Sequence, residues 1–218
     1  RRLKEEPIAK ILNKKNFWKY EFYVNKHVLD PRPESELIIE ESINCIKNKN
    51  QRIKILDVGS GTGCLSICLS KEFKNSKIIC IDISKKALEV TKKNILLHKC
   101  QDKIEIKQTE ISSIDDKFDL IVSNPPYLSL SEYQNSENNI KNFEPKIAFL
   151  GGNDGLKFYK IFSKKLPKIM KKNSYLILEI GENQYLDCLK IFVNSGLKLI
   201  KKTKDLQKKD RILVFSKI

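Results

Sequence analysis

The chain has 218 residues and a formal net charge of +15, with 42 Lys and Arg against 27 Asp and Glu. This length suits one full α/β domain with a substantial core. No segment approaches the run of about 18 apolar residues that a membrane span needs, and no apolar signal core follows the basic N-terminus. A soluble, cytoplasmic protein is therefore expected. The charge fits a nucleic-acid or ribosome-associated partner, but mostly comes from Lys in an Ile- and Asn-rich chain, so it decides little.

The first residue is Arg and the only Met is Met170, so we expect a piece of a longer translation product. The six cysteines are scattered through apolar segments, as reduced core residues of a cytosolic protein would be. Cys64 and Cys68 would share one face of a helix. However, there is no CxxC pair and the only histidines are His27 and His98, so no metal site is predicted.

The N-terminal segment of the chain reads as a connector leading into a main domain. Residues up to about 17 are basic, and the alternation over 21–29 predicts a short hairpin around Asn25 and Lys26. Residues 34–46 have the spacing of a helix with one apolar side. We therefore expect residues 1–33 to form a connector with a short β-hairpin and residues 34–218 to form the main domain.

From Arg52 onward, apolar strands alternate with amphipathic helices. Strands are predicted over 52–59, 77–82, 103–108, 118–123, 175–181, 197–202 and 211–217, and helices over 64–73, 84–97, 156–166 and 184–192. Ser84 is the expected N-cap of its helix, and a long polar loop is expected over 130–149. This alternation predicts a mostly parallel sheet covered on both faces, with the last two strands as an antiparallel edge pair.

A glycine-rich loop follows the first of these strands, where the sequence reads DVGSGTG (57–63). Gly permits a positive-φ turn and a close ligand approach, and the next helix presents free N–H groups. Asp82 ends the next strand, where a carboxylate can accept both ribose hydroxyls of an adenosine. The same geometry serves NAD and S-adenosylmethionine. The spacing GxGxG is not the dinucleotide form GxGxxG, which favours S-adenosylmethionine.

The segment SNPPYLS (123–129) leaves a strand predicted to lie beside that loop. Ligands bind at the carboxyl ends of strands in open α/β sheets. A planar nitrogen is a poor nucleophile, and acceptors on its N–H groups would hold it and favour loss of planarity. The Asn124 side-chain oxygen and the Pro125 carbonyl are such acceptors, both restricted by the prolines. Tyr127 can lie against the flat face of the substrate group. Taken alone, the segment equally fits a proline-rich strand exit.

Two further stretches carry a family resemblance. The stretch FYVNKHVLDPRPESE (22–36) is similar to the hairpin and Pro-Arg-Pro-Glu-Thr-Glu segment of the bacterial release-factor glutamine methyltransferases. The stretch EPKIAFLGGNDGLKFYKIF (144–162) is similar to their Glu-Pro…Gly-Gly-x-Asp-Gly-Leu…Tyr segment. Each alone would pass for a connector or a loop-to-helix entry. With NPPY, which nucleic-acid methyltransferases share, they make the chain resemble this family from near Arg1 to the C-terminus.

The resemblance implies a class I S-adenosylmethionine-dependent methyltransferase (Rossmann-like) fold, with a seven-stranded, mostly parallel sheet and an antiparallel C-terminal edge hairpin. It implies methyl transfer to N5 of the glutamine in the Gly-Gly-Gln motif of class 1 peptide chain release factors, without a metal. The implied cofactor contacts are Gly59, Ser60, Gly61, Thr62, Gly63, Asp82, Glu110, Ile111 and Asn124, and the implied substrate contacts are Asn124, Pro125, Pro126 and Tyr127. We expect a monomer whose partners are release factors, with no membrane contact and at most weak or indirect contact with nucleic acid.

The chain departs from the family pattern at Ile111, Ser35 and Asp30. Glu110 and Ile111 stand where the family has an acidic residue and often an aromatic one, which leaves the adenine contacts open. Ser35 replaces Thr and Asp30 replaces an apolar residue, and neither change removes a group that the chemistry requires. The family's N-terminal helical domain is almost wholly absent from the sequence, either removed or naturally lacking.

Two other functions remain open at this point. NPPY and the positive charge suit an adenine-N6 or guanine-N2 nucleic-acid methyltransferase, although no separate target-recognition domain is evident. A non-catalytic RNA-binding protein that keeps the cofactor pocket only as structure is the third reading.

Overall fold

The computed structural model describes residues 1–217, for Lys4 the backbone only, and its main sheet has seven strands in the order β5-β4-β3-β6-β7-β9-β8. The strands are β3 (Ile53–Val58), β4 (Ser76–Asp82), β5 (Ile104–Gln108), β6 (Phe118–Ser123), β7 (Met170–Glu179), β8 (Lys198–Lys204) and β9 (Asp210–Lys217). β3 to β7 are parallel, and β9 is antiparallel to both of its neighbours, β7 and β8. The predicted class I methyltransferase architecture with its antiparallel C-terminal hairpin is confirmed.

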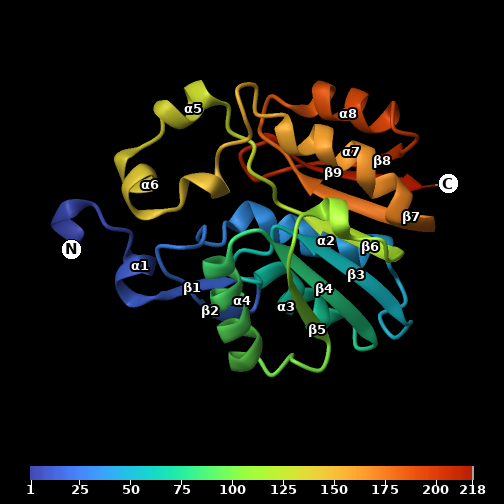
Figure 1. Cartoon of the computed structure of the whole chain (residues 1–218), viewed down its shortest axis with the longest axis horizontal. Helices are drawn as coiled ribbons and strands as arrows, with labels where there is room; N and C mark the ends of the chain where they lie inside the picture. The colour runs from blue at the N-terminus through green and yellow to red at the C-terminus, as the bar shows by residue number, and fades with distance from the viewer. Residues whose placement is uncertain (218) are drawn as a thin grey trace.

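Helices cover both faces of this sheet (Figure 1). The α-helices are α1 (Ile8–Leu12), α2 (Glu36–Cys45), α3 (Cys64–Glu72), α4 (Lys85–Leu97), α5 (Leu130–Gln134), α6 (Asn138–Phe143), α7 (Lys157–Ile169) and α8 (Tyr185–Val193). Short 3-10 turns are η1 (Arg2–Lys4), η2 (Pro33–Ser35), η3 (Ile111–Ser113) and η4 (Lys146–Ala148). As predicted, Ser84 caps α4, its hydroxyl accepting from the Ala87 N–H at 3.2 Å.

The core consists of two apolar layers separated by the sheet. Ile55 and Ile177 face a cluster that includes α2 and α3, whereas Leu56 and Leu178 face a cluster that includes α7 and α8. Successive side chains of each strand point to opposite faces of the sheet, and both faces are buried. These strands therefore appear in the sequence as continuous apolar runs. No helix within residues 1–217 is long and apolar enough to cross a membrane.

The N-terminal hairpin lies earlier in the chain than predicted. It is formed by β1 (Lys14–Phe17) and β2 (Tyr20–Tyr23), so the prediction of a hairpin around Asn25 and Lys26 is wrong. Its turn contains Trp18 at φ 55°, held there because its backbone N–H bonds Glu36 and its indole N–H bonds Glu72. These are tertiary contacts, and no local turn signal encodes them. The division into residues 1–33 and 34–218 stays a prediction, and Ile218 lies outside the described residues.

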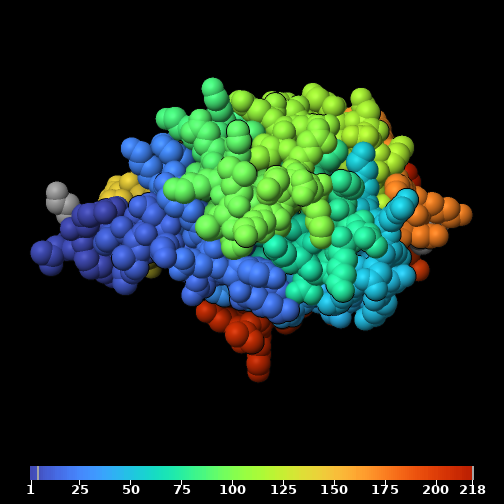
Figure 2. Space-filling model, turned by 90° about the horizontal axis from the view of Figure 1, so that it is seen from below, coloured from blue at the N-terminus to red at the C-terminus, as the bar shows by residue number. Residues whose placement is uncertain are grey.

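The segment 130–149 is also more ordered than predicted. It contains α5, α6 and η4 in place of one long loop. Ser129 begins α5 with a reciprocal capping box to Glu132, a sequence signature of helix starts. The red tip that projects from the body of the molecule in Figure 2 belongs to the C-terminal hairpin, whose strand β9 lies between β7 and β8 in the sheet.

Candidate active site

The glycine-rich loop presents its backbone and not its side chains. Gly59 and Gly61 have φ of 77° and 54°, and a Cβ at either position would meet no atom within 4 Å. Ser60 and Thr62 are buried. The Gly59 and Ser60 N–H groups donate to the Ile81 carbonyl at 2.9 and 3.1 Å, which holds the loop over β4. The open space over the glycines is a cradle that a ligand can enter closely.

Helix α4 supports this loop from behind. The Thr91 hydroxyl donates to the Gly61 carbonyl at 2.8 Å, and the Asn94 amide donates to the Thr62 carbonyl at 2.9 Å. Asn94 also exchanges hydrogen bonds with the backbone of Tyr23 in β2, so it joins the hairpin to the loop. Sequence reasoning missed both residues. The available signal was a pair of polar residues three apart within the apolar face of an amphipathic helix.

Asp82 lies at the end of β4, next to the loop. Its carboxylate accepts from the Gly61 N–H at 3.0 Å and the Ser84 N–H at 2.8 Å, and burial raises its pKa. A carboxylate has about four acceptor positions, so two ribose hydroxyls can still be bound. After β5, Glu110 is exposed and Ile111 is buried among core residues. The structure therefore places the Ile111 side chain in the apolar core and leaves the Glu110 side chain in solvent.

Asn124 follows β6, whose last residue is tied to β3 by the Ser123 hydroxyl, which donates to the Val58 carbonyl at 2.7 Å. The Asn124 side-chain N–H donates to the Ser35 hydroxyl at 2.8 Å. The Asn124 carboxamide oxygen is thereby turned away from Ser35. No hydrogen bond to the Pro125 carbonyl occurs within residues 1–217. Both acceptors predicted from NPPY are thus free.

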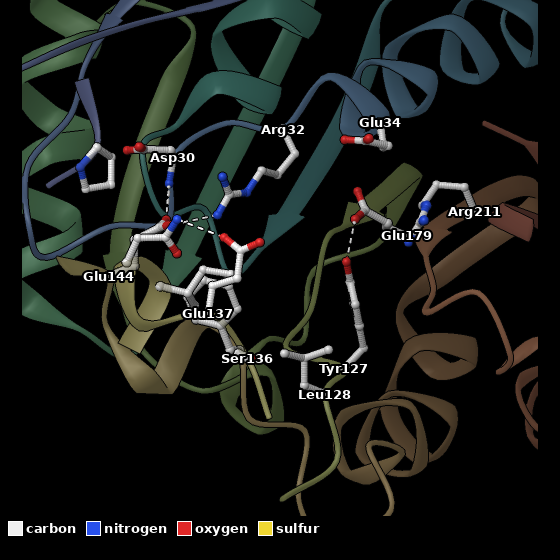
Figure 3. Close-up of a pocket in the computed structure, with 14 residues that line it drawn as sticks. Asp30, Arg32, Glu34, Tyr127, Leu128, Ser136, Glu137, Glu144, Glu179 and Arg211 are labelled. Atoms are coloured by element: carbon white, nitrogen blue, oxygen red, sulfur yellow. Dashed lines mark hydrogen bonds and ion pairs between the residues drawn. The ribbon is translucent and has the colours of Figure 1, made fainter. Parts of the chain in front are cut away.

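Glu179, at the end of β7, connects Ser35 to Tyr127. The Ser35 hydroxyl donates to one carboxylate oxygen of Glu179 at 2.5 Å. The Tyr127 hydroxyl lies 3.4 Å from the other carboxylate oxygen (Figure 3). Glu179 is 1% exposed, and burial raises its pKa to about 7. Burial likewise raises the pKa of Tyr127, so its phenol stays a donor. Sequence reasoning missed Glu179, although a lone carboxylate in the apolar strand YLILEIG was a visible signal.

The two stretches that carried the family resemblance meet beside this group. Arg32 forms an ion pair with Glu144 at 2.5 Å, and Glu144 also accepts from the Asp30 N–H at 2.8 Å (Figure 3). Asp30 itself is buried, and Lys10 of α1 lies 2.6 Å from its carboxylate. The replacement of an apolar residue by Asp30 is therefore matched by a buried Lys10.

The glycines of GGNDG (151–155) brace the NPPY segment. A Cβ on Gly151 would lie 2.7 Å from the Pro126 carbonyl oxygen, so only Gly allows this approach. The Gln184 amide donates to the carbonyls of Tyr127 at 2.8 Å and Gly155 at 3.3 Å. NPPY is therefore supported by the segment 151–155 and by Gln184, the residue before α8. Gln184 was not predicted, because nothing local distinguishes it from a surface Gln.

A cleft of about 520 Å³ opens beside Tyr127 and Glu179. Its lining carries side chains of both charges, among them Arg32, Arg211, Glu34 and Glu137 (Figure 3). Such a cleft can admit a polar main chain. No group of three or more His, Cys, Asp and Glu side chains that could hold a metal ion occurs in the part of the chain that the structure describes.

The strand order, the glycine loop and the acidic end of β4 together define a class I methyltransferase fold. The sequence matches the family described as "Methyltransferase small domain" over residues 36–142. A solved structure of a release-factor-specific protein-(glutamine-N5) methyltransferase from Alicyclobacillus acidocaldarius covers 86% of this chain and 93% of its own, with 21% identity and a TM-score of 0.52. At that identity the likeness shows the fold alone.

Curated relatives give the family. A release factor glutamine methyltransferase from Clostridium botulinum is 36% identical over 95% of this chain and 74% of its own length. The chain therefore belongs to the release factor glutamine methyltransferase family. A bifunctional methyltransferase from Rickettsia typhi is 38% identical over all of this chain but 46% of its own length. The chain thus spans about half the length of the bifunctional relatives that it matches.

Proposed function

We propose that this chain transfers a methyl group from S-adenosylmethionine to the side-chain amide nitrogen of the glutamine in the Gly-Gly-Gln motif of class 1 release factors. The observation that carries the proposal is the environment of Asn124. Ser35 of the 22–36 stretch bonds its amide group, and Gly151 of the 144–162 stretch lies under Pro126. Both stretches that distinguish this family from nucleic-acid enzymes therefore contribute to the segment that would hold the substrate.

The residues present fit the cofactor. The open backbone at Gly59 and Gly61 would receive the methionine part, with Ser60, Thr62 and Gly63 shaping the loop, and Asp82 would accept the ribose hydroxyls. The proposed adenine contacts are Glu110 and Ile111, of which Ile111 can offer only its buried apolar surface. When bound, S-adenosylmethionine supplies an electrophilic methyl group on a sulfonium.

Asn124, Pro125 and Tyr127 would position the substrate amide. The Asn124 Oδ1 and the Pro125 carbonyl oxygen each accept one N–H of the glutamine carboxamide, which orients the nitrogen and favours loss of its planarity. Pro126 restricts Pro125 to extended geometry, so the pair of acceptors is formed in advance. Tyr127 covers the flat face of the amide. An alkylated amide nitrogen is strongly acidic, so its proton can leave to water and no strong general base is required.

The test is a transfer assay with a radiolabelled methyl donor and three acceptors: purified release factor, the same release factor with Gln of the Gly-Gly-Gln motif changed to Ala, and a mixture of DNA and rRNA. We expect label in the first acceptor only. Label in DNA or rRNA but not in release factor would replace the proposal with an adenine-N6 or guanine-N2 activity.

Calorimetry with S-adenosylmethionine separates a third outcome. Absence of cofactor binding, or binding without transfer to any acceptor, would indicate a non-catalytic protein. The same assays on the full translation product would show whether segments beyond this chain change the affinity for the release factor.

A further inference from the structure

We propose that Ser35 and Glu179 are positioning residues that fix the orientation of the Asn124 carboxamide, with ionised Glu179 selecting the orientation in which Asn124 accepts from the substrate. This inference rests on the proposed function of Asn124. It is carried by a continuous chain of hydrogen bonds, from the Asn124 amide to the Ser35 hydroxyl at 2.8 Å and from that hydroxyl to Glu179 at 2.5 Å.

The direction of these hydrogen bonds follows from Glu179, the last group in the series. An ionised carboxylate has no proton and can only accept, so the Ser35 hydroxyl must donate its single hydrogen to Glu179. Ser35 then has only lone pairs left for Asn124, which must turn its NH2 group toward Ser35. The carboxamide oxygen therefore faces the site as an acceptor, which is what binding of an N–H group requires.

Protonation of Glu179 removes this constraint. A neutral carboxylic acid can donate to Ser35, whose own hydrogen is then free for the Asn124 oxygen. In that arrangement the Asn124 amide is rotated, and its NH2 group faces the site as a donor. That NH2 group would face an N–H of the substrate amide, and two donors form no hydrogen bond, so this state does not orient the substrate nitrogen.

The environment of Glu179 allows both protonation states near neutral pH. Burial raises its pKa to about 7, and the nearby Glu34 acts in the same direction. Ser35, Tyr127 and the positive charge of Arg211 on β9 act in the opposite direction. The Tyr159 hydroxyl of α7 bonds the Glu179 backbone carbonyl and leaves the carboxylate alone. No ion pair to the Glu179 carboxylate occurs within residues 1–217, where Arg211 pairs with Asp205 instead.

The pH profile of methyl transfer tests the inference. In the wild type, kcat should rise with pH through about 7, as Glu179 ionises. Gln can either accept from Ser35 or donate to it and does not titrate, so Glu179→Gln should abolish the rise near neutral pH and lower kcat at pH 8 by about tenfold, with cofactor affinity unchanged. Ser35→Ala should do the same, whereas Ser35→Thr, which retains the hydroxyl, should keep both rate and profile.

Glu41→Gln is the matched control. Glu41 is a buried carboxylate on α2 that bonds Lys201 and Thr203 and has no link to Asn124. Its substitution should leave the pH profile unchanged, whatever its effect on stability. A Glu179→Gln variant that keeps the wild-type rate and profile would overturn the inference. So would a loss of rate that leaves the rise through neutral pH in place.

An NMR titration tests the hydrogen bonds from Asn124 to Glu179 without relying on methyl transfer. The side-chain NH2 signals of Asn124 should shift with a midpoint near pH 7 in the wild type and stay constant in Glu179→Gln. If the wild type methylates no release factor but shows this titration, the function is wrong and the hydrogen-bond chain stands. If it methylates release factor but the Asn124 signals do not titrate, the function stands and the inference fails.

Discussion

The proposed cofactor side of this site, which is the loop 59–63 with Asp82, and the proposed substrate side, around Asn124, are built differently. The loop 59–63 and Asp82 come from one continuous strand-helix-strand unit, and the ligand-facing groups are mainly backbone at Gly59 and Gly61. The substrate side is assembled from segments far apart in the chain, joined by side-chain bonds such as that between Ser35 and Glu179 across 144 positions. A local unit can be recognised from spacing alone, whereas the second side exists only after the whole domain has folded.

Substitution of Asn124 should separate the two sides of the site most strongly. Asn124→Ala removes a proposed substrate acceptor but no group of the glycine loop, so methyl transfer should fall about a hundredfold to a thousandfold. Cofactor affinity should change little. Single-turnover transfer and calorimetry measure the two effects. Asn75→Ala, an exposed Asn before β4 at the opposite end of the sheet, is the control. Equal loss of transfer and of cofactor affinity would contradict the division into two sides.

Asp82→Asn probes the other side. Loss of charge-assisted bonds to the ribose should weaken S-adenosylmethionine binding by about tenfold to a hundredfold. At saturating cofactor, kcat should recover most of its wild-type value, because the acceptors at Asn124 and Pro125 are untouched. Glu105→Gln removes an exposed carboxylate from the adjacent β5 and should leave affinity unchanged. A loss of kcat that saturating cofactor does not restore would place Asp82 outside the proposed role.

The stability of the folded protein should depend on pH because Glu179 titrates. The pKa of Glu179 is raised from 4.5 to about 7 in the folded state. Its contribution to stability is therefore full below about pH 4.5 and is lost as pH rises through about 7. Gln is neutral throughout, so Glu179→Gln should raise the free energy of unfolding at pH 8 by about 3 kcal/mol and change it little at pH 4.5. Urea unfolding at pH 8 and at pH 4.5 measures the free energy of unfolding. A lower value for Glu179→Gln than for the wild type at pH 8 would contradict the prediction.

The smallest expected effect is on the support beneath NPPY. Gly151→Ala would place a Cβ 2.7 Å from both the Pro126 and Gly155 carbonyl oxygens. We expect a loss of about 1–3 kcal/mol of stability together with reduced methyl transfer at constant cofactor affinity. Gly196→Ala is the control, because Gly196 has φ 88° with open space around it, so its strain should cost stability without touching the site. Normal transfer by Gly151→Ala would show that NPPY does not depend on this support.

Residues with strong local signals were predictable, and residues held by distant contacts were not. The strands, the glycine loop and the Ser84 cap follow from apolar runs, Gly spacing and capping chemistry. The turn at Trp18 was misplaced because Glu36 and Glu72 hold it. Glu179 and Gln184 were missed because their partners lie on other elements. Arg32 and Glu144 were quoted only as parts of motifs, and their pairing needed the folded chain.

By itself, the sequence determined the succession of strands and helices along the chain, the glycine loop after β3 and the position of Asn124 and Pro125 at the end of β6. These properties follow from residue type and spacing over short stretches. Only the tertiary structure decided which way the Asn124 amide faces and what charge state controls it. The physical reason is that this orientation depends on a buried carboxylate at the end of β7 and a hydroxyl in η2, which are far apart in the sequence and come into contact only in the folded domain.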